Sequence, residues 1–242
     1  LIWNSVPQVH NAPADVVLGQ PDFKSNAVNA GTGDPRVPGP KTLRGPQGVW
    51  IQDGRLFVAD TQNHRVLIWN RIPTSTFEPA DIVLGQPNFS SAIEPDLTKT
   101  TIDAKPNTLL NPVSVTSDGI RLYVADLGHN RVLIWNSIPT QNQQPADVAI
   151  GQPDLTSAVA NNSSKLCESK GKDDQGNEQY PARCAATLDF PRYALADGRR
   201  LFIADGGNDR VLIFNSIPVS SGAAADIVLG QISAEANNTT ES

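Results

Sequence analysis

The chain has 242 residues, of which 39% are hydrophobic, so it has enough apolar side chains to form a sizeable buried core. Its formal net charge of -6 argues against a nucleic-acid partner, because affinity for phosphates rests on clustered Lys and Arg. No apolar run approaches the roughly 20 residues that a membrane-spanning helix needs, which argues against a membrane span.

The first 20 residues, LIWNSVPQVHNAPADVVLGQ, introduce a segment that recurs three times along the chain. Aligned on Trp3, Trp69, Trp135 and Phe214, the copies are 66, 66 and 79 residues apart. The period is therefore 66 residues with one insertion. A fixed period of this length indicates a repeat array or a propeller.

Four short strands are expected in each complete unit. In the unit at 47–86 they lie at 48–51, 55–59, 66–69 and 81–84, which are rich in β-branched, aromatic and aliphatic residues. Polar turn residues separate them, including the pair Asp53-Gly54 between the first two strands. No segment carries the apolar stripe that a helix would need. The pattern predicts an all-β fold, a β-propeller of four-stranded antiparallel blades.

Two further complete blades are expected at 112–152 and 191–231. The segment 1–20 supplies only the two outer strands of a blade, at 1–4 and 15–20, and the tail at 232–242 is polar and poor in β-formers. This gives fourteen strands, or about three and a half blades, whereas closed propellers usually have about four to eight.

The chain has neither Met nor a charged-then-apolar leader, so we expect a mature product or a fragment. Either the full protein continues to six blades of about 66 residues each, or another copy of the chain completes it.

The hairpin between the second and third strands resembles the core of the NHL-repeat family of propellers, in which "VAD" is followed by Asn, Arg and Val. This core is found at 56–60 with Asn63, Arg65 and Val66, at 122–126 with Asn130, Arg131 and Val132, and at 201–205 with Asn208, Arg210 and Val211. The LGQP and IWNSIP elements look most like those of secreted bacterial members. The resemblance implies the blade fold and leaves the function open, since NHL-type propellers include RNA binders, protein-binding scaffolds and a peptide-amidating lyase.

Three long connections, at 21–46, 87–111 and 153–190, join the outer strand of one blade to the inner strand of the next. In a four-stranded meander they emerge on the same face as the turn between strands two and three. Variable loops on a rigid scaffold are a common place for binding, so we expect a protein or a small polar ligand to contact this face. The alternative is that the loops are spacers that pack over the blades.

The third connection contains both cysteines of the chain, Cys167 and Cys184, on either side of a hydrophilic stretch. This arrangement predicts one disulfide and therefore an extracellular, cell-surface or periplasmic location. The absence of His from the loop argues against a metal site there. Possible glycosylation sites in Asn-x-Ser/Thr triplets are Asn88, Asn161, Asn162, Asn237 and Asn238.

Residues that recur in every blade are interpreted as structural, because a catalytic residue is normally needed once. Each Asp that ends strand two is followed five residues later by the Arg that opens strand three, which predicts cross-strand ion pairs. The expected pairs are Asp60/Arg65, Asp126/Arg131 and Asp205/Arg210. The large aromatic residues of strand three are expected in the core between blades. The repeated Gly-Gln pairs, such as Gly85-Gln86, are expected to end the outer strand with a backbone bend and a side-chain amide bond.

Few residues outside the repeat suggest chemistry. His64 and His129 lie in equivalent hairpin turns, where we expect solvated side chains, and His10 lies on the opposite face. These are too few to supply the converging ligands of a zinc lyase. We therefore predict no catalytic residue, no metal and no cofactor.

The predicted function is a secreted or surface-exposed, non-enzymatic binding scaffold that acts through the long-loop face. One alternative is a structural subunit of an extracellular assembly, in which propeller segments complete or stack on one another. A second alternative is a zinc-dependent lyase of the peptide-amidating type.

Overall fold

Three four-stranded antiparallel sheets dominate the computed structural model, which describes residues 1–31, 33, 34, 36–93 and 104–236. Blade 1 comprises β1 (Gly48–Gln52), β2 (Arg55–Asp60), β3 (Arg65–Trp69) and β4 (Ile82–Leu84). Blade 2 comprises β5 (Pro112–Ser117), β6 (Leu122–Asp126), β7 (Arg131–Trp135) and β8 (Val148–Ile150). Blade 3 comprises β9 (Pro191–Ala196), β10 (Leu201–Asp205), β11 (Arg210–Phe214) and β12 (Ile227–Leu229).

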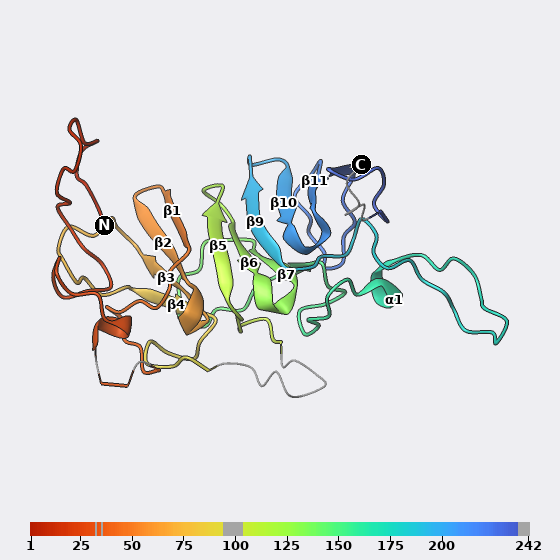
Figure 1. Ribbon diagram of the computed structural model, residues 1–242, viewed down its shortest axis with the longest axis horizontal. Helices are drawn as coiled ribbons and strands as arrows, with labels where there is room; N and C mark the ends of the chain where they lie inside the picture. Colours follow the sequence, from red (N-terminus) through yellow and green to blue (C-terminus); the bar gives the residue numbers. More distant parts are fainter. Residues whose placement is uncertain (32, 35, 94–103, 237–242) are drawn as a thin grey trace.

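Each sheet is a meander in which the strands pair in chain order, and the three sheets stand side by side like blades of a propeller (Figure 1). The predicted fold class is therefore confirmed. The Asp-Gly turns join the first and second strands at one end of the sheets. The long connections run along the other end, shown at the bottom of Figure 1.

The described helices are all short. They are η1 (Val28–Gly31), η2 (Thr61–Asn63), η3 (Leu127–His129), α1 (Ser163–Leu166) and η4 (Gly206–Asn208). In each blade, one of η2, η3 and η4 closes the turn between the second and third strands. No helix in the described ranges has the length and apolar character needed to span a bilayer.

The segment 1–20 differs from its predicted form. Instead of two strands it has one isolated antiparallel bridge, Ile2 to Val16, so twelve strands are described rather than fourteen. Its side chains nevertheless make the bonds of an outer blade half: Trp3 Nε1 donates to the Ala12 carbonyl at 3.0 Å, as Trp135 Nε1 does to that of Gln144. Within the described residues this pair of segments has no inner strands beside it to extend a hydrogen-bonded ladder, which explains the short pairing.

The hydrophobic core lies between neighbouring blades. Phe57 and Ile68 of blade 1 pack in one cluster with Val124 of blade 2. Tyr123 of blade 2 packs in a second cluster with Ile203 of blade 3. Burying one such side chain contributes about 1.5–3 kcal/mol, so each blade is stabilised mainly by its neighbours. The third-strand aromatic residues lie in these clusters and in a third one, as predicted.

Hydrogen bonds between blades supplement this packing. On the inner strands, Trp50 Nε1 donates to the Ser117 carbonyl at 3.1 Å and Thr116 Oγ1 donates to the Ala194 carbonyl at 2.7 Å. At the outer edge, the Gln143 N–H donates to the Val83 carbonyl at 2.8 Å. These bonds hold the three blades in one register relative to each other.

Candidate functional site

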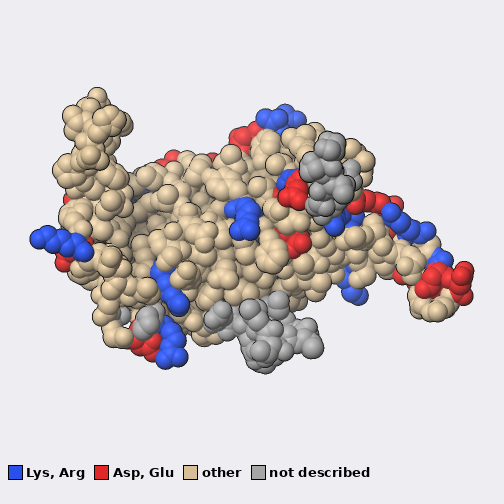
Figure 2. Space-filling view, in the orientation of Figure 1, with Lys and Arg blue, Asp and Glu red and all other residues tan. Residues whose placement is uncertain are grey.

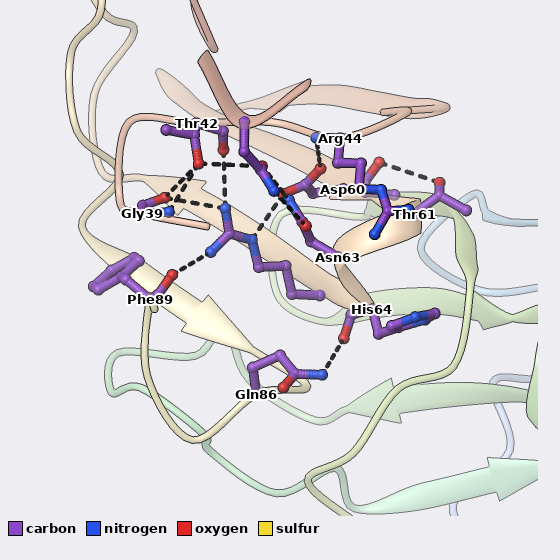
Figure 3. Close-up of polar contacts among 12 residues, drawn as sticks. Gly39, Thr42, Arg44, Asp60, Thr61, Asn63, His64, Gln86 and Phe89 are labelled. Carbon is purple, nitrogen blue, oxygen red and sulfur yellow. Dashed lines mark hydrogen bonds and ion pairs between the residues drawn. The ribbon is translucent and has the colours of Figure 1, made fainter. Parts of the chain in front are cut away.

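A buried ion pair anchors the hairpin turn of blade 1. Asp60 Oδ1 accepts the Arg44 N–H at 2.7 Å, and Asp60 Oδ2 accepts Arg65 Nε at 2.7 Å and Asn63 Nδ2 at 2.8 Å (Figure 3). Both charged side chains are fully buried. We call this pair and the equivalent pairs of the other two blades, Asp126/Arg131 and Asp205/Arg210, the hairpin ion pairs.

The remaining N–H groups of Arg65 reach two different long connections. Nη1 donates to the Phe89 carbonyl at 2.7 Å, in the connection that follows blade 1. Nη2 donates to the carbonyls of Gly39 and Thr42 at 3.1 and 2.9 Å, in the connection that precedes it. Figure 3 shows these carbonyls around one guanidinium. A single side chain therefore fixes the backbone of both loops to the blade.

Blades 2 and 3 repeat this arrangement. The Asp126/Arg131 and Asp205/Arg210 pairs are both 2.8 Å apart and fully buried. Their Nη atoms donate to the carbonyls of Leu155, Lys105 and Thr108 in blade 2, and of Ala234, Cys184 and Thr187 in blade 3. The sequence predicted the pairs but not these carbonyl contacts, because backbone acceptors leave no side-chain pattern.

The repeated Gly-Gln pairs bend the chain after the outer strand. Gly85 has a φ of +89°, and a Cβ added there would lie 2.7 Å from Leu109. Gln86 Nε2 then donates to the carbonyls of His64 and Ile93. This side-chain amide ties the outer strand to the hairpin turn of the same blade.

The two cysteines form a disulfide, with the Cα atoms of Cys167 and Cys184 5.8 Å apart. The loop between them includes an antiparallel bridge from Lys172 to Glu178, and the segment after α1 projects away from the blades at the right of Figure 1. The Cys184 carbonyl accepts Arg210 Nη2 at 3.0 Å. The disulfide-bonded loop is therefore attached to the hairpin ion pair of blade 3.

Three of the five possible glycosylation sites fall within the described residues. Asn161 and Asn162 point into the structure, where their Nδ2 atoms donate to Asn208 Oδ1 and Gln152 Oε1. Asn88 is exposed, and its Oδ1 accepts the Ser90 N–H at 2.9 Å. Of these three, Asn88 is the one open to modification in the folded chain. Asn237 and Asn238 lie outside the described residues.

The prediction that His64 and His129 are solvated is wrong. His64 is buried and its Nδ1 accepts the Asn111 N–H at 3.1 Å, which links blade 1 to the start of blade 2. His129 is fully buried with Nδ1 2.8 Å from Asp126 Oδ2, the position that Asn63 and Asn208 fill in the other blades. The turns curl inward around the ion pair, which buries side chains that sequence alone places in a polar loop. Among the described residues, no three His, Cys, Asp or Glu side chains gather as metal ligands.

The start of β9 carries side chains that the other blades lack. Asp189-Phe190 stands where blade 1 has Arg44-Gly45 and blade 2 has Leu110-Asn111. Phe190 is 47% exposed and has a φ of +46°, a left-handed conformation that is unusual for a bulky residue. Such backbone outliers cluster at functional sites. We call Arg183, Asp189, Phe190 and Arg192 the blade 3 rim.

Polar atoms at the blade 3 rim have no partners within the described chain. They are Asp189 Oδ1 and the Nε and Nη1 of Arg183, all of them buried. Burial and the negative charge of Asp205 raise the pKa of the Asp189 carboxyl, while Arg183 opposes this rise. Arg192 is exposed. Half-exposed ionisable groups with a shifted pKa are candidates for binding or chemistry.

Two glycines of η4 leave space for the side chains of Asp189 and Arg192. A Cβ on Gly207 would lie 2.7 Å from Asp189 Cγ, and a Cβ on Gly206 would lie 2.7 Å from Arg192 Cγ. Sequence reasoning missed the rim, although comparison of the aligned units offered a signal. Asp189, Phe190 and Gly206 each differ in chemistry from their equivalents in the other two blades.

The visible surface carries scattered charges and no extended basic stripe (Figure 2). Lys and Arg side chains lie singly among Asp, Glu and uncharged residues on this face. Such a distribution offers no continuous track for a phosphate backbone on the visible side.

A family model described as NHL repeat matches residues 43–69, which cover the strands β1 to β3. No curated protein sequence matches the chain. Solved structures are also similar to the chain, and they include a lyase and a cyclase. A streptogramin B lyase is 11% identical with a TM-score of 0.31, over 71% of this chain and 51% of the lyase. The glutaminyl cyclase of Myxococcus xanthus is 13% identical with a TM-score of 0.27, over 74% of this chain and 70% of the cyclase.

The chain thus spans about half the length of the lyase. Likenesses at this level carry no argument about activity. The propeller-type architecture rests on the three blades themselves, and one of them contains the matched NHL repeat.

Proposed function

We propose that this chain is a secreted or surface-exposed binding scaffold, without catalytic activity, whose long-loop face contacts a protein or a small polar ligand. The observation that carries the proposal is the repeated guanidinium that holds two connections to each blade. The long connections differ in sequence, but the hairpin ion pairs hold their backbones at equivalent positions in each blade. We call the three hairpin ion pairs and the backbone groups that they bind the frame. Rigid elements that present variable loops are suited to recognition.

The disulfide supports the proposed location. A Cys167–Cys184 bond persists in an oxidising compartment such as the extracellular space, the cell surface or the periplasm. The exposed Asn88 would carry sugar if the host glycosylates secreted proteins. Intact mass before and after reduction and deglycosylation would test both features.

The central test is hydrogen-exchange mapping of ligands selected from arrays of extracellular peptides and glycans. The scaffold proposal expects slowed exchange in the long connections and in η2, η3 and η4. Slowed exchange confined to the opposite turns, such as those at 70–80 and 136–147, would contradict it. Stoichiometric zinc in the natural protein, or chemical conversion of a selected ligand, would favour the lyase alternative instead.

Assembly is the second candidate, and the outward faces of the blade row favour it. Val49 of β1 is 66% exposed, whereas Val115, its equivalent in β5, is 1% exposed because blade 1 covers it. Tyr193 and Leu195 are exposed on the far side of blade 3. These apolar faces have the chemistry of a blade-to-blade contact. Native mass spectrometry distinguishes the candidates, since a scaffold expects a monomer and an assembly subunit expects a multiple of the chain mass.

A further inference from the structure

The blade 3 rim combines three kinds of recognition group within a short stretch of chain. Phe190 offers an exposed ring, Arg192 an exposed guanidinium, and Asp189 a buried carboxylate oxygen without a partner among the described residues. Arg183, from the disulfide-bonded loop, adds two buried N–H groups that likewise lack an acceptor. An apolar group of a ligand can pack on the ring, an anionic group can bind the guanidinium groups, and an N–H can donate to the carboxylate oxygen.

The positions of Asp189 and Arg192 follow from η4. Their Cγ atoms both lie 2.7 Å from Cβ positions on the adjacent residues Gly206 and Gly207, so both side chains pack against one short turn. Arg183 interacts electrostatically with Asp189 without forming an ion pair with it. The carboxylate and this guanidinium are therefore close enough to attract each other, and each keeps unpartnered polar atoms.

The charges of the rim favour one negative charge in a ligand. Asp205 is already paired with Arg210, which leaves Arg183 and Arg192 against Asp189. Guanidinium groups bind carboxylates through directed, charge-assisted hydrogen bonds. The unpartnered oxygen of Asp189 needs a donor such as an amide N–H. The ring of Phe190 can pack against an apolar or aromatic side chain.

We propose that the blade 3 rim binds the carboxy-terminal residue of a peptide with an apolar side chain. The exposed groups would make the first contacts, Arg192 with its carboxylate and Phe190 with its side chain. The buried N–H groups of Arg183 would then bind the carboxylate, and the buried oxygen of Asp189 would accept the backbone N–H, once a local movement of the rim exposes them. This inference rests on the proposed function, and it specifies the ligand class and the part of the loop face that binds it.

The backbone conformation of Phe190 is a second observation that supports a binding role for this residue. Gly45 occupies the equivalent position in blade 1 with a φ of +55°. Glycine adopts this conformation without strain, so an exposed Phe there costs stability unless its ring has another use. Phe190→Gly should therefore raise the melting temperature while it abolishes ligand contact. A purely structural Phe190 would give the reverse result for stability.

The test is an NMR titration of the full chain with N-acetyl-phenylalanine, which carries a carboxylate, an N–H and an aromatic group. We expect saturable binding with shifts at the rim, and at least about tenfold weaker binding for N-acetyl-phenylalanine amide, which lacks the charge. Arg192→Ala should weaken binding by a similar factor. Arg199→Ala, an exposed Arg at the opposite end of the same blade, is the matched control and should bind normally, as should Phe23→Ala.

Several outcomes would overturn the proposal. Equal binding of the acid and the amide would show that the carboxylate is not recognised. Binding of unmodified phenylalanine alone would mean that the site takes a free amino acid rather than a peptide end. Absence of binding by N-acetyl-phenylalanine and by a Gly-Gly-Phe peptide would remove the site, whereas other array ligands that protect the connections would still support the scaffold function.

Discussion

The hairpin ion pair of blade 3 and the blade 3 rim are in direct contact, because the Asp189 N–H donates to Asp205 Oδ1 at 2.8 Å, yet their construction is opposite. Each hairpin Asp is fully buried and accepts hydrogen bonds on both carboxylate oxygens, in every blade. Asp189 is half-buried, occurs once, and has one oxygen without a partner in the described chain. In a repeat protein, residues that occur in every blade can therefore have a structural role, while a residue that occurs in one blade is free to have a different role. Repeated Asp and Arg pairs with satisfied carboxylates hold the connections to the blades, and the single Asp189 is the carboxylate that we propose for ligand binding.

The two carboxyl groups also differ in protonation. Burial raises the pKa of Asp126, but the attraction of His129 and Arg131 and their hydrogen bonds outweigh it, so the pKa lies below its usual range. At Asp189, burial and the repulsion from Asp205 outweigh the attraction of Arg183, so the pKa lies above its usual range. Low pH should therefore weaken the Asp126/Arg131 pair and stabilise the protonated Asp189. The Asp60 carboxyl of blade 1 differs from Asp126, because its burial outweighs the attraction of Arg65 and raises its pKa.

Removal of a hairpin Arg should have the largest effect. Arg131→Ala leaves Asp126 buried without its guanidinium partner and releases three carbonyls of the connections. We expect a loss of about 3–5 kcal/mol in the free energy of unfolding, measured by urea denaturation. Arg36→Ala breaks an exposed pair and should cost at most about 1 kcal/mol. Similar costs for both variants would mean that the hairpin ion pairs do not hold the frame.

Loss of the disulfide should have the next largest effect. The double variant Cys167→Ser, Cys184→Ser opens a loop with a sequence separation of 17. Loop-closure entropy predicts a destabilisation of about 3 kcal/mol. Reductant should lower the melting temperature of the wild-type chain to that of the variant. If the variant and the oxidised wild type have the same melting temperature, the hydrogen bonds of the loop alone fix it.

Replacement of His129 should have a smaller effect on stability, and one of opposite sign. His129 Nε2 is buried without a partner in the described residues, whereas Asn63 donates from the equivalent position of blade 1 to Asp60 and to Asn29. His129→Asn keeps the donor to Asp126 and removes the unsatisfied atom, so we expect a gain of about 1 kcal/mol. The measurement belongs at about pH 8, where an unperturbed imidazole is uncharged and its attraction for Asp126 does not enter the difference. Calorimetry of this variant beside Asn63→His would check it, since the reverse exchange should destabilise blade 1. A loss in both variants would show that the cavity left by His129 outweighs the satisfied bond.

Changes at the rim should affect stability least. Because the folded pKa of Asp189 lies above its unfolded value, the folded chain binds the proton more tightly and stability falls as pH rises through the folded pKa. Asp189→Asn removes this loss. The variant should melt slightly higher than the wild type at neutral pH, and the difference should vanish below the ordinary Asp pKa of about 3.9. A difference that grows at low pH would have the wrong sign for a raised pKa.

The repeat made the frame predictable from sequence. The four strand patterns and the Asp and Arg of the hairpin recur in each complete unit. A pattern that occurs three times at equivalent positions rarely arises by chance, so its structural meaning could be inferred from the sequence. The contacts from Arg65 to Gly39 and Phe89 were not predictable, because the acceptors are main-chain carbonyls whose side chains differ between units. The inward direction of His64 and His129 depends on the left-handed residue at each turn, which polarity patterns do not report. The rim was not predictable from the repeat, because Asp189 and Phe190 each occur in one blade only.

The guanidinium contacts also bear on what happens when the chain is cut. Arg65 holds Gly39 and Thr42 on one side of blade 1 and Phe89 on the other, and Arg131 and Arg210 do the same for their blades. A protease that cleaves a connection between two such holding points would produce two ends that both remain bound to the blades. In the third connection the disulfide adds a covalent link across a cut between its cysteines. Nicked molecules should therefore stay assembled, which would be an advantage in the extracellular location that we propose.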